Sequence, residues 1–322
     1  MIQEAIQNFY IQFQYNPIIE NGDTLGNFSK YILVGMGGSH LAGDLLKIWK
    51  PDLDIIIHSD YGLPELSDDD LHQRLIILNS YSGNTEEVLH AFQTAFQKKL
   101  PMLCISIGGK LLELAKNSSI PYIQIPNTNI QPRMAVGFSM KALIKIIGSE
   151  QGLRELTDVS QLLKSVEFES ATKNFAEGIQ NRIPLIYASR RNAPLAEYWK
   201  IALNEGAKIP AFWNVFPELN HNEIAGFDTK SKTDDLLKNF LVIILRDLND
   251  DPKILKRMEI FQMILARRHI PVEVIDLKNE LQFYKIFYSV LFVSSVAYFL
   301  AENYGVDPDS VPIIEEFKEL IQ

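Results

Sequence analysis

The chain alternates short apolar runs with amphipathic stretches, and this pattern predicts its secondary structure. Five runs in the first half have the length and composition of buried strands, at 31–37, 53–59, 74–80, 101–107 and 120–126. Between them, apolar residues recur at helical spacing, at 41–49, 85–99 and 111–118. Strands this apolar, joined by helices, are typical of a parallel sheet with both faces covered.

The same alternation restarts in the second half of the chain. A helical pattern at 133–148 closes the first part, and a polar segment at 149–170 follows it. Strand patterns then return at 183–189, 240–245 and 270–276, again separated by helices. We therefore expect an α/β protein with two doubly wound parallel sheets, in domains at 1–150 and 151–322. A length of 322 residues agrees with two domains.

Composition and charge narrow the class of protein. The single cysteine, Cys104, excludes internal disulfides and a cysteine-based zinc cluster, which suggests a reducing, cytoplasmic location. The N-terminal residues lack the pattern of a signal peptide. The longest apolar stretch, 286–301, is shorter than the roughly 20 residues that span a bilayer, so we expect a buried or interface helix and no membrane association. A net charge of −9 argues against a nucleic-acid partner.

A turn of small polar residues follows the third predicted strand. The stretch "ILNSYSGNTEEVLHAF" contains Ser80, Ser82 and Thr85 between an apolar run and a helical pattern. Asn84 and Glu87 have the spacing of a capping box, which predicts a helix that starts near Thr85. The free N–H groups and the dipole of such a helix would bind an anion without a lysine. An ordinary strand–helix turn with good capping residues would give the same pattern.

A second turn of small residues follows the first predicted strand. "LVGMGGSHLAGDLL" places Gly38 and Ser39 between that strand and a helix. A G-x-G-x-x-G dinucleotide motif would need a glycine where His40 stands. Because Asp60 lies near the end of the second strand, a dinucleotide-dependent dehydrogenase stays open as an alternative. Two such turns on one sheet suit a single phosphate monoester better than a pyrophosphate.

These two turns resemble those of a known domain. "GMGGS" and "SYSGNTEE" are similar to the sugar isomerase (SIS) domain, a flavodoxin-like fold whose Ser- and Thr-rich turn grips the phosphate of a phosphosugar. The absence of lysine and arginine within the turn agrees with that mode of binding. The resemblance implies five phosphate ligands: Gly38, Ser39, Ser80, Ser82 and Thr85.

Three further stretches carry groups that could react. "NIQPRMAVGF" contains Arg133, "LNEGAK" contains Glu205, and "FPELNHNEIAGF" contains His221. Each alone would pass as an ordinary surface or helix-end residue. Together with "GVDPDSVPIIEEFKEL" they are similar, over nearly the whole chain, to the bifunctional phosphoglucose/phosphomannose isomerase family.

That resemblance implies an enzyme that needs no cofactor. The histidines are scattered and no pair of His or carboxylate residues has metal-ligand spacing, so we also expect chemistry without a metal ion. The enzyme would be an intramolecular oxidoreductase, interconverting fructose 6-phosphate with glucose 6-phosphate and mannose 6-phosphate through a cis-enediol. Glu205 would be the base that moves the proton, and Arg133 would stabilise the enediolate. His221 would open the sugar ring. A lysine on the last helix of the family corresponds to Lys318.

The residues leave several alternatives open. Glu218 and Glu223 lie close enough to His221 to compete as the base. Val311 stands where the family can carry a hydroxyl, with Ser310 beside it, so the preference between the two aldose epimers is open.

The resemblance also leaves the class of function and the assembly to be tested. A non-catalytic phosphosugar-binding SIS regulator would keep the serine turn but would not need the three reactive groups. The family implies a homodimer whose sites are shared between subunits, and the 286–301 helix is a candidate interface element.

Overall fold

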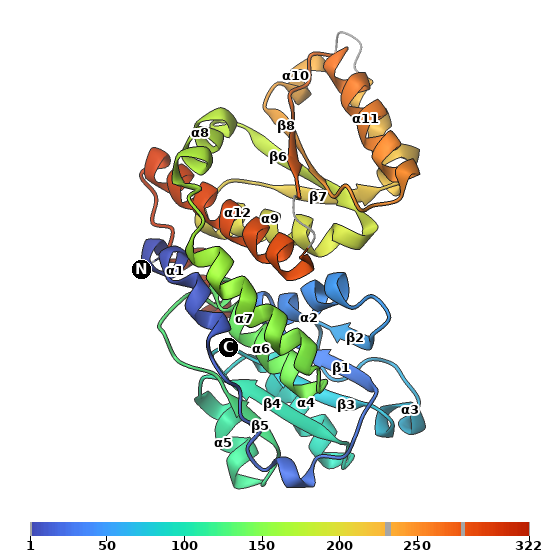
Figure 1. Ribbon diagram of the computed structural model, residues 1–322, viewed down its shortest axis with the longest axis vertical. Helices are drawn as coiled ribbons and strands as arrows, with labels where there is room; N and C mark the ends of the chain where they lie inside the picture. The colour runs from blue at the N-terminus through green and yellow to red at the C-terminus, as the bar shows by residue number, and fades with distance from the viewer. Residues whose placement is uncertain (1, 229–232, 278–280, 322) are drawn as a thin grey trace. The chain divides into compact units, whose positions relative to one another are not determined.

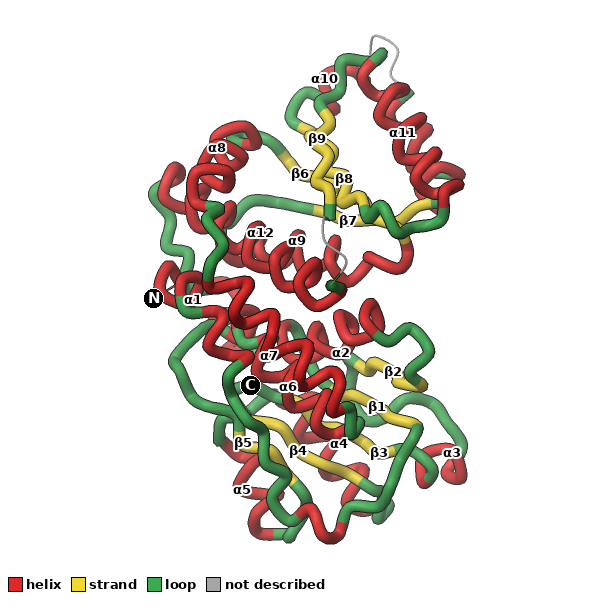
Figure 2. Tube along the Cα trace, in the orientation of Figure 1, coloured by secondary structure: helices red, strands yellow, loops and turns green. Residues whose placement is uncertain are grey.

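The computed structural model describes residues 2–228, 233–277 and 281–321. It contains two β-sheets in which all strand pairs are parallel, and helices lie on the faces of each sheet (Figure 1; Figure 2). The prediction of an α/β protein with two parallel sheets is therefore confirmed.

Contacts within the chain divide it into two units, which we describe separately. The first unit comprises residues 7–165, and the second unit comprises residues 1–6 and 166–322. The domain boundary that we expected at residue 150 coincides with the start of a helix that belongs to the first unit, α7 (Glu150–Lys164).

The sheet of the first unit has five strands in the order β2-β1-β3-β4-β5. This is the flavodoxin-like order, in which the chain leaves β1 in one direction and then crosses back to β3. All residues of β3 and β4 are buried, as expected for strands covered on both faces. The strands are β1 (Lys30–Val34), β2 (Asp54–His58), β3 (Leu75–Asn79), β4 (Met102–Ser106) and β5 (Tyr122–Gln124).

Helices pack on both faces of this sheet. On one face α2 approaches so closely that a Cβ on Gly43 would lie 2.3 Å from Leu33 Cδ2. On the other face Val88 of α4 and Leu111 of α5 belong to the same buried cluster as Ile76. The helical elements are η1 (Phe9–Phe13), η2 (Gly22–Thr24), α2 (Gly38–Trp49), α3 (Asp68–His72), α4 (Glu86–Gln97), α5 (Gly109–Asn117), η3 (Pro132–Met134), α6 (Val136–Ile146) and α7 (Glu150–Lys164).

The sheet of the second unit has four strands in the order β7-β6-β8-β9. The sequence did not predict β7, which lies at one edge of the sheet. Phe212 and Trp213 at its start are 56% and 37% exposed, so it lacks the run of buried residues that identified the other strands. The strands are β6 (Ile183–Ser189), β7 (Phe212–Phe216), β8 (Phe240–Arg246) and β9 (Val272–Asp276).

The longest helix of the second unit, α12, forms part of its core. It packs against α8 and α9, where Trp199 stacks on Phe292 with ring centroids 6.0 Å apart. By length and composition α12 could cross a membrane, but 78% of its most apolar window is buried inside the protein. Its buried side chains are occupied within their own unit, so using them as an interface would require unpacking the core.

Several short elements complete the second unit. The helical elements are α1 (Ile2–Gln7), α8 (Glu169–Ile179), η4 (Arg190–Asn192), α9 (Ala193–Gly206), η5 (Glu218–His221), η6 (Glu223–Phe227), α10 (Asp234–Leu237), α11 (Pro252–Ala266), α12 (Gln282–Tyr304) and α13 (Pro312–Leu320).

A buried ion pair joins α12 to the carboxyl end of β8. Lys285 Nζ lies 2.7 Å from Asp247 Oδ1, and the two side chains are 3% and 2% exposed. Removing one partner of a buried pair leaves an uncompensated charge in the core, which costs far more than breaking a surface pair.

Lys285→Met should therefore lower the free energy of unfolding by about 3–5 kcal/mol, measured by urea denaturation. The control is Lys256→Met, which breaks the exposed pair between Lys256 and Glu259 and should cost about 0–1 kcal/mol. Equal losses in the two variants would contradict the structural role of the buried pair.

Candidate functional site

The two predicted turns meet at the carboxyl edge of the first sheet. They follow β1 and β3, which are neighbours in the sheet and flank the point where the strand order reverses. Asn79 Nδ2 donates to the Ser39 carbonyl oxygen at 2.6 Å, and the Tyr81 N–H donates to Ser39 Oγ at 3.2 Å. The structure thus ties the turn that carries Ser39 directly to the turn that carries the other hydroxyls.

Hydroxyl groups of the second turn gather at the start of α4. Ser80 Oγ and Thr85 Oγ1 are 2.8 Å apart, and the Gly83 N–H donates to Ser80 Oγ at 3.0 Å. Ser82 Oγ accepts from the Asn84 N–H at 3.2 Å. Two hydroxyls therefore lie together where the dipole of α4 favours negative charge.

The predicted capping box is wrong. Thr85, not Asn84, occupies the N-cap position of α4, and the Asn84 side chain instead accepts from the Lys110 N–H at 3.1 Å. The Thr85 hydroxyl bonds Ser80 and makes no capping bond to the helix. With no side-chain cap, the first N–H groups of α4 face the turn, which suits them to an anionic ligand.

Arg133 lies against the first turn. A Cβ on Gly38 would be 2.6 Å from the Pro132 carbonyl oxygen and 2.8 Å from the Arg133 nitrogen, so only glycine allows this approach. Arg133 lies in η3 and is 4% exposed. The structure thus brings Gly38, Ser39 and Arg133 together within the first unit.

Glu205 lies in the last turn of α9 in the second unit, half-buried. It lines a cavity of about 470 Å³ together with Ser310 and Val311. The sequence had marked both of those positions. Lys318 lies further along α13, exposed, and its Nζ is 2.8 Å from Glu315 Oε1. In this structure Lys318 therefore makes a surface ion pair.

His221 is exposed at the end of η5. The two glutamates near it, Glu218 and Glu223, have different hydrogen-bond partners. Glu223 accepts short hydrogen bonds from the Tyr187 hydroxyl and from Asn214 Nδ2. Burial and this bond to Glu223 raise the pKa of Tyr187. Glu218 accepts from Asn222 Nδ2 at 2.9 Å on the surface. Because both oxygens of Glu223 hold other parts of the fold, Glu223 is a poor competitor for the role of base.

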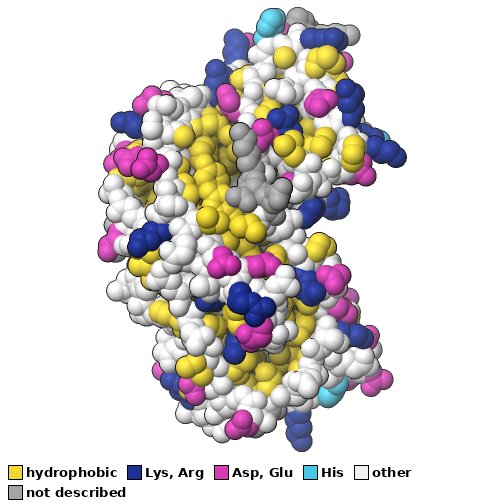
Figure 3. Space-filling model, in the orientation of Figure 1, with side chains coloured by type: hydrophobic (Ala, Val, Ile, Leu, Met, Phe, Trp, Pro, Cys, Tyr) yellow, Lys and Arg dark blue, Asp and Glu magenta, His cyan; other side chains and the backbone are white. Residues whose placement is uncertain are grey.

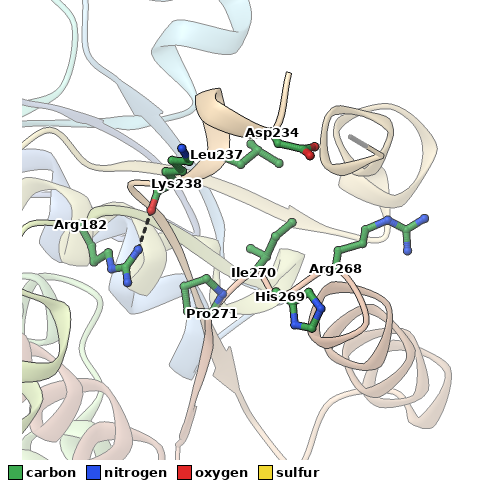
Figure 4. Close-up of a pocket in the computed structure, with 8 residues that line it drawn as sticks. All are labelled: Arg182, Asp234, Leu237, Lys238, Arg268, His269, Ile270 and Pro271. Carbon is green, nitrogen blue, oxygen red and sulfur yellow. Dashed lines mark hydrogen bonds between the residues drawn. The ribbon is translucent and has the colours of Figure 1, made fainter. Parts of the chain in front are cut away.

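A larger cavity, of about 790 Å³, lies at the edge of the second sheet where β6, β8 and β9 begin (Figure 4). Arginine and lysine side chains line this cavity, and each of them already bonds another group of the protein. Arg182 donates to the Lys238 carbonyl oxygen at 2.6 Å. Ion pairs hold the other two cations, Lys238 with Asp235 (2.5 Å) and Arg268 with Asp228 (3.0 Å). The described lining of this cavity includes none of the residues predicted to act on a substrate, so the smaller cavity beside Glu205 is the better candidate for chemistry.

The structure also bears on metal binding and on thiol chemistry. Within residues 2–228, 233–277 and 281–321, no group of three or more His, Cys, Asp or Glu side chains could hold a metal ion. The prediction of metal-independent chemistry stays a prediction. Cys104 is buried in β4, and burial raises the pKa of its thiol, which disfavours a nucleophilic thiolate.

Comparison with known proteins identifies relatives over both halves of the chain. A family model described as the bacterial phospho-glucose isomerase C-terminal SIS domain matches residues 168–321. A bifunctional phosphoglucose/phosphomannose isomerase of Aquifex aeolicus is 32% identical over 99% of this chain and 97% of its own length.

Solved structures show the same fold at low sequence identity. A hypothetical protein of Thermus thermophilus has a TM-score of 0.70 and 15% identity, covering 99% of this chain and 87% of its own. A glucosamine-6-phosphate deaminase of Thermotoga maritima has a TM-score of 0.66 and 16% identity, covering 97% and 96%.

Gly38→Ala should disturb the contact between the first turn and Arg133. The added methyl group would overlap backbone atoms, so the free energy of unfolding should fall by about 1–3 kcal/mol, and inorganic phosphate should stabilise the variant less than the parent. The control is Gly178→Ala in α8, where an added Cβ would meet no described atom within 4 Å, and stability should stay the same or rise by up to about 1 kcal/mol. Unchanged stability and phosphate response in Gly38→Ala would show that this close approach is dispensable.

Proposed function

Because the chain belongs to the bifunctional phosphoglucose/phosphomannose isomerase family, we propose that it interconverts fructose 6-phosphate with glucose 6-phosphate and mannose 6-phosphate. The observation that carries this proposal is the gathering of Ser80 and Thr85 hydroxyls at the start of α4, tied to the turn of Ser39. Such a cluster suits a phosphate monoester, the group that all three sugars share.

The first unit would bind the phosphate and stabilise the enediolate. Gly38, Ser39, Ser80, Ser82 and Thr85 are the proposed phosphate ligands, through hydroxyls and backbone N–H groups. Arg133 would face the oxygen on which negative charge develops, because a fixed cation stabilises that charge without reorganisation.

The second unit would move the protons. Glu205 would take a proton from C1 of fructose 6-phosphate and return it to C2, through a cis-enediol. His221 would open the ring of the cyclic sugar phosphates, since its imidazole can donate and accept protons near neutral pH. Lys318 is proposed to contact the substrate, which would require it to leave Glu315. No cofactor enters these steps.

A regulator that binds phosphosugars without turning them over is the alternative of another class. It would keep the hydroxyl turn, but it would have no use for Glu205 beside a cavity. We further propose that the protein is cytoplasmic and acts as a homodimer whose sites are shared between subunits. Turnover of fructose 6-phosphate in the presence of EDTA would separate the enzyme from the regulator and from a metal-dependent isomerase.

Removing a hydroxyl from the phosphate turn should weaken binding more than it slows the reaction. Ser82→Ala and Thr85→Val should raise KM for fructose 6-phosphate by about tenfold with a smaller change in kcat, because the phosphate is bound alike in ground and transition states. The control is Thr94→Val, which removes a hydroxyl bonded to the His90 carbonyl oxygen later in α4. An unchanged KM in both turn variants would remove this turn from the site.

Glu205→Gln should abolish proton transfer while keeping the size of the side chain. Turnover should fall by roughly 10²–10⁴-fold, and exchange of the C2 proton with solvent deuterium, followed by NMR, should fall with it. The matched control is Glu218→Gln, which loses only the surface bond to Asn222 and should keep normal exchange. Exchange that persists in the Glu205 variant but disappears in the Glu218 variant would transfer the role of base to Glu218.

A further inference from the structure

Lys208 bridges two segments that are far apart in the sequence. It follows the end of α9 and has a positive φ of 58°, which turns the chain away from the helix. Its ammonium group donates to the Glu205 carbonyl oxygen in a short hydrogen bond and to the Ser310 carbonyl oxygen at 2.6 Å. One side chain thus joins the turn that carries Glu205 to the segment that leads into α13.

Both segments are walls of the same cavity. The cavity of about 470 Å³ beside Glu205 includes Lys208, and its remaining lining is mostly apolar. Opposite the end of α9, the lining comes from the segment that the Lys208 bond holds: Val306, Asp307, Ser310, Val311, Pro312, Ile313 and Ile314. Lys208 therefore links the end of α9 that carries Glu205 to the opposite wall of the cavity.

The held segment is itself ordered by hydrogen bonds that two of its carboxylates accept from backbone N–H groups. The Asp309 N–H donates to Asp307 Oδ1 at 2.9 Å, and the Ile2 N–H donates to Asp309 Oδ2 at 3.3 Å. The Asp309 N–H first, then Ser310 and to a smaller extent Lys208, lower the pKa of Asp307, which keeps a negative charge near the ammonium group. A lysine suits this place because an ammonium can donate to two carbonyl oxygens at once.

We propose that Lys208 is a positioning residue that fixes the cavity wall opposite Glu205 and thereby sets the ratio of the two aldose products. This inference rests on the proposed function of Glu205. In the isomerisation, O2 of the ketose gains a proton as C1 loses one, and C2 of the enediol then gains a proton as O1 loses one. The two aldoses differ only in the face of C2 that is protonated, so the wall that orients the enediol above Glu205 selects between them.

The test is Lys208→Met, which keeps the aliphatic stem and removes both hydrogen bonds. The initial rates of glucose 6-phosphate and mannose 6-phosphate formation from fructose 6-phosphate should change unequally, shifting their ratio at least about twofold. Because small misplacements are costly in a reacting geometry, kcat should fall by roughly 10- to 100-fold while KM stays within about twofold. Lys208→Arg, which can still donate to two carbonyls, should restore most of kcat and the parent ratio.

The matched control is Lys238→Met, which removes a lysine of the same unit from its ion pair with Asp235 and should leave both rates unchanged. If Lys208→Met does not fold, Lys208→Leu serves instead, since its side chain can donate to neither carbonyl oxygen. Parent kcat and parent ratio in the Met or Leu variant overturn the proposal. So does a fall in kcat with an unchanged ratio, because Lys208 would then not orient the enediol.

Hydrogen–deuterium exchange gives a readout that does not depend on activity. Peptides that cover residues 306–314 should exchange faster in Lys208→Met than in the parent, and Lys208→Arg should restore their protection. Faster exchange in a protein that turns over no hexose phosphate would refute the proposed function and leave the bridge standing. Unchanged exchange would refute the bridge even if the parent enzyme is active.

Discussion

Parallel strand pairing is the constraint on which the rest of the structure depends. Because neighbouring strands run in the same direction, each connection must cross over the sheet, and the helices begin at the edge where the strands end. That edge collects strand-end loops and helix N-termini, whereas the faces of the sheet are filled by apolar contacts. The positions of Ser39 after β1 and of Ser80 and Thr85 after β3 follow from this arrangement. The place of the candidate anion site therefore follows from the way the sheet is connected.

The same constraint explains how much of the fold the sequence could predict. Strands buried on both faces read as unbroken apolar runs, and β3 and β4 were found for that reason. The edge strand β7 is buried only at Val215 and Phe216, so its pattern gives no clear period. The start of α4 was placed correctly, but its N-cap was assigned to the wrong residue, because Asn84 and Thr85 both suit that position locally. The choice between them depends on Lys110 and Ser80, which lie elsewhere along the chain.

The parts of the candidate site that depend on contacts between distant segments could likewise not be predicted from the sequence. Residue types at strand ends pointed to the hydroxyl turn, whereas Arg133 and Glu205 were identified only through the resemblance to a family. The sequence could not distinguish Glu218 from Glu223, because both flank His221 at similar separations. The fold distinguishes them through Tyr187, on a strand in another part of the unit, which bonds Glu223. Lys208 was missed for the same reason, since its role depends on a carbonyl group at Ser310 that no local pattern reveals.

The charge of the chain gives a reason why the proposed phosphate site uses neutral donors. With 40 acidic residues against 31 lysines and arginines, a cation placed at a loop readily finds a carboxylate, and charges of both signs lie intermixed on the face drawn in Figure 3. Pairs of this kind hold two of the cations around the larger cavity and one at the end of β8: Lys238 with Asp235, Arg268 with Asp228 and Lys285 with Asp247. A paired cation has to lose its partner before it can bind a dianion, which costs free energy. Hydroxyl groups and helix N–H groups carry no charge that an aspartate could neutralise, so they keep their capacity for the phosphate. The acidic composition of this chain is therefore compatible with an anion site built from hydroxyl and N–H groups.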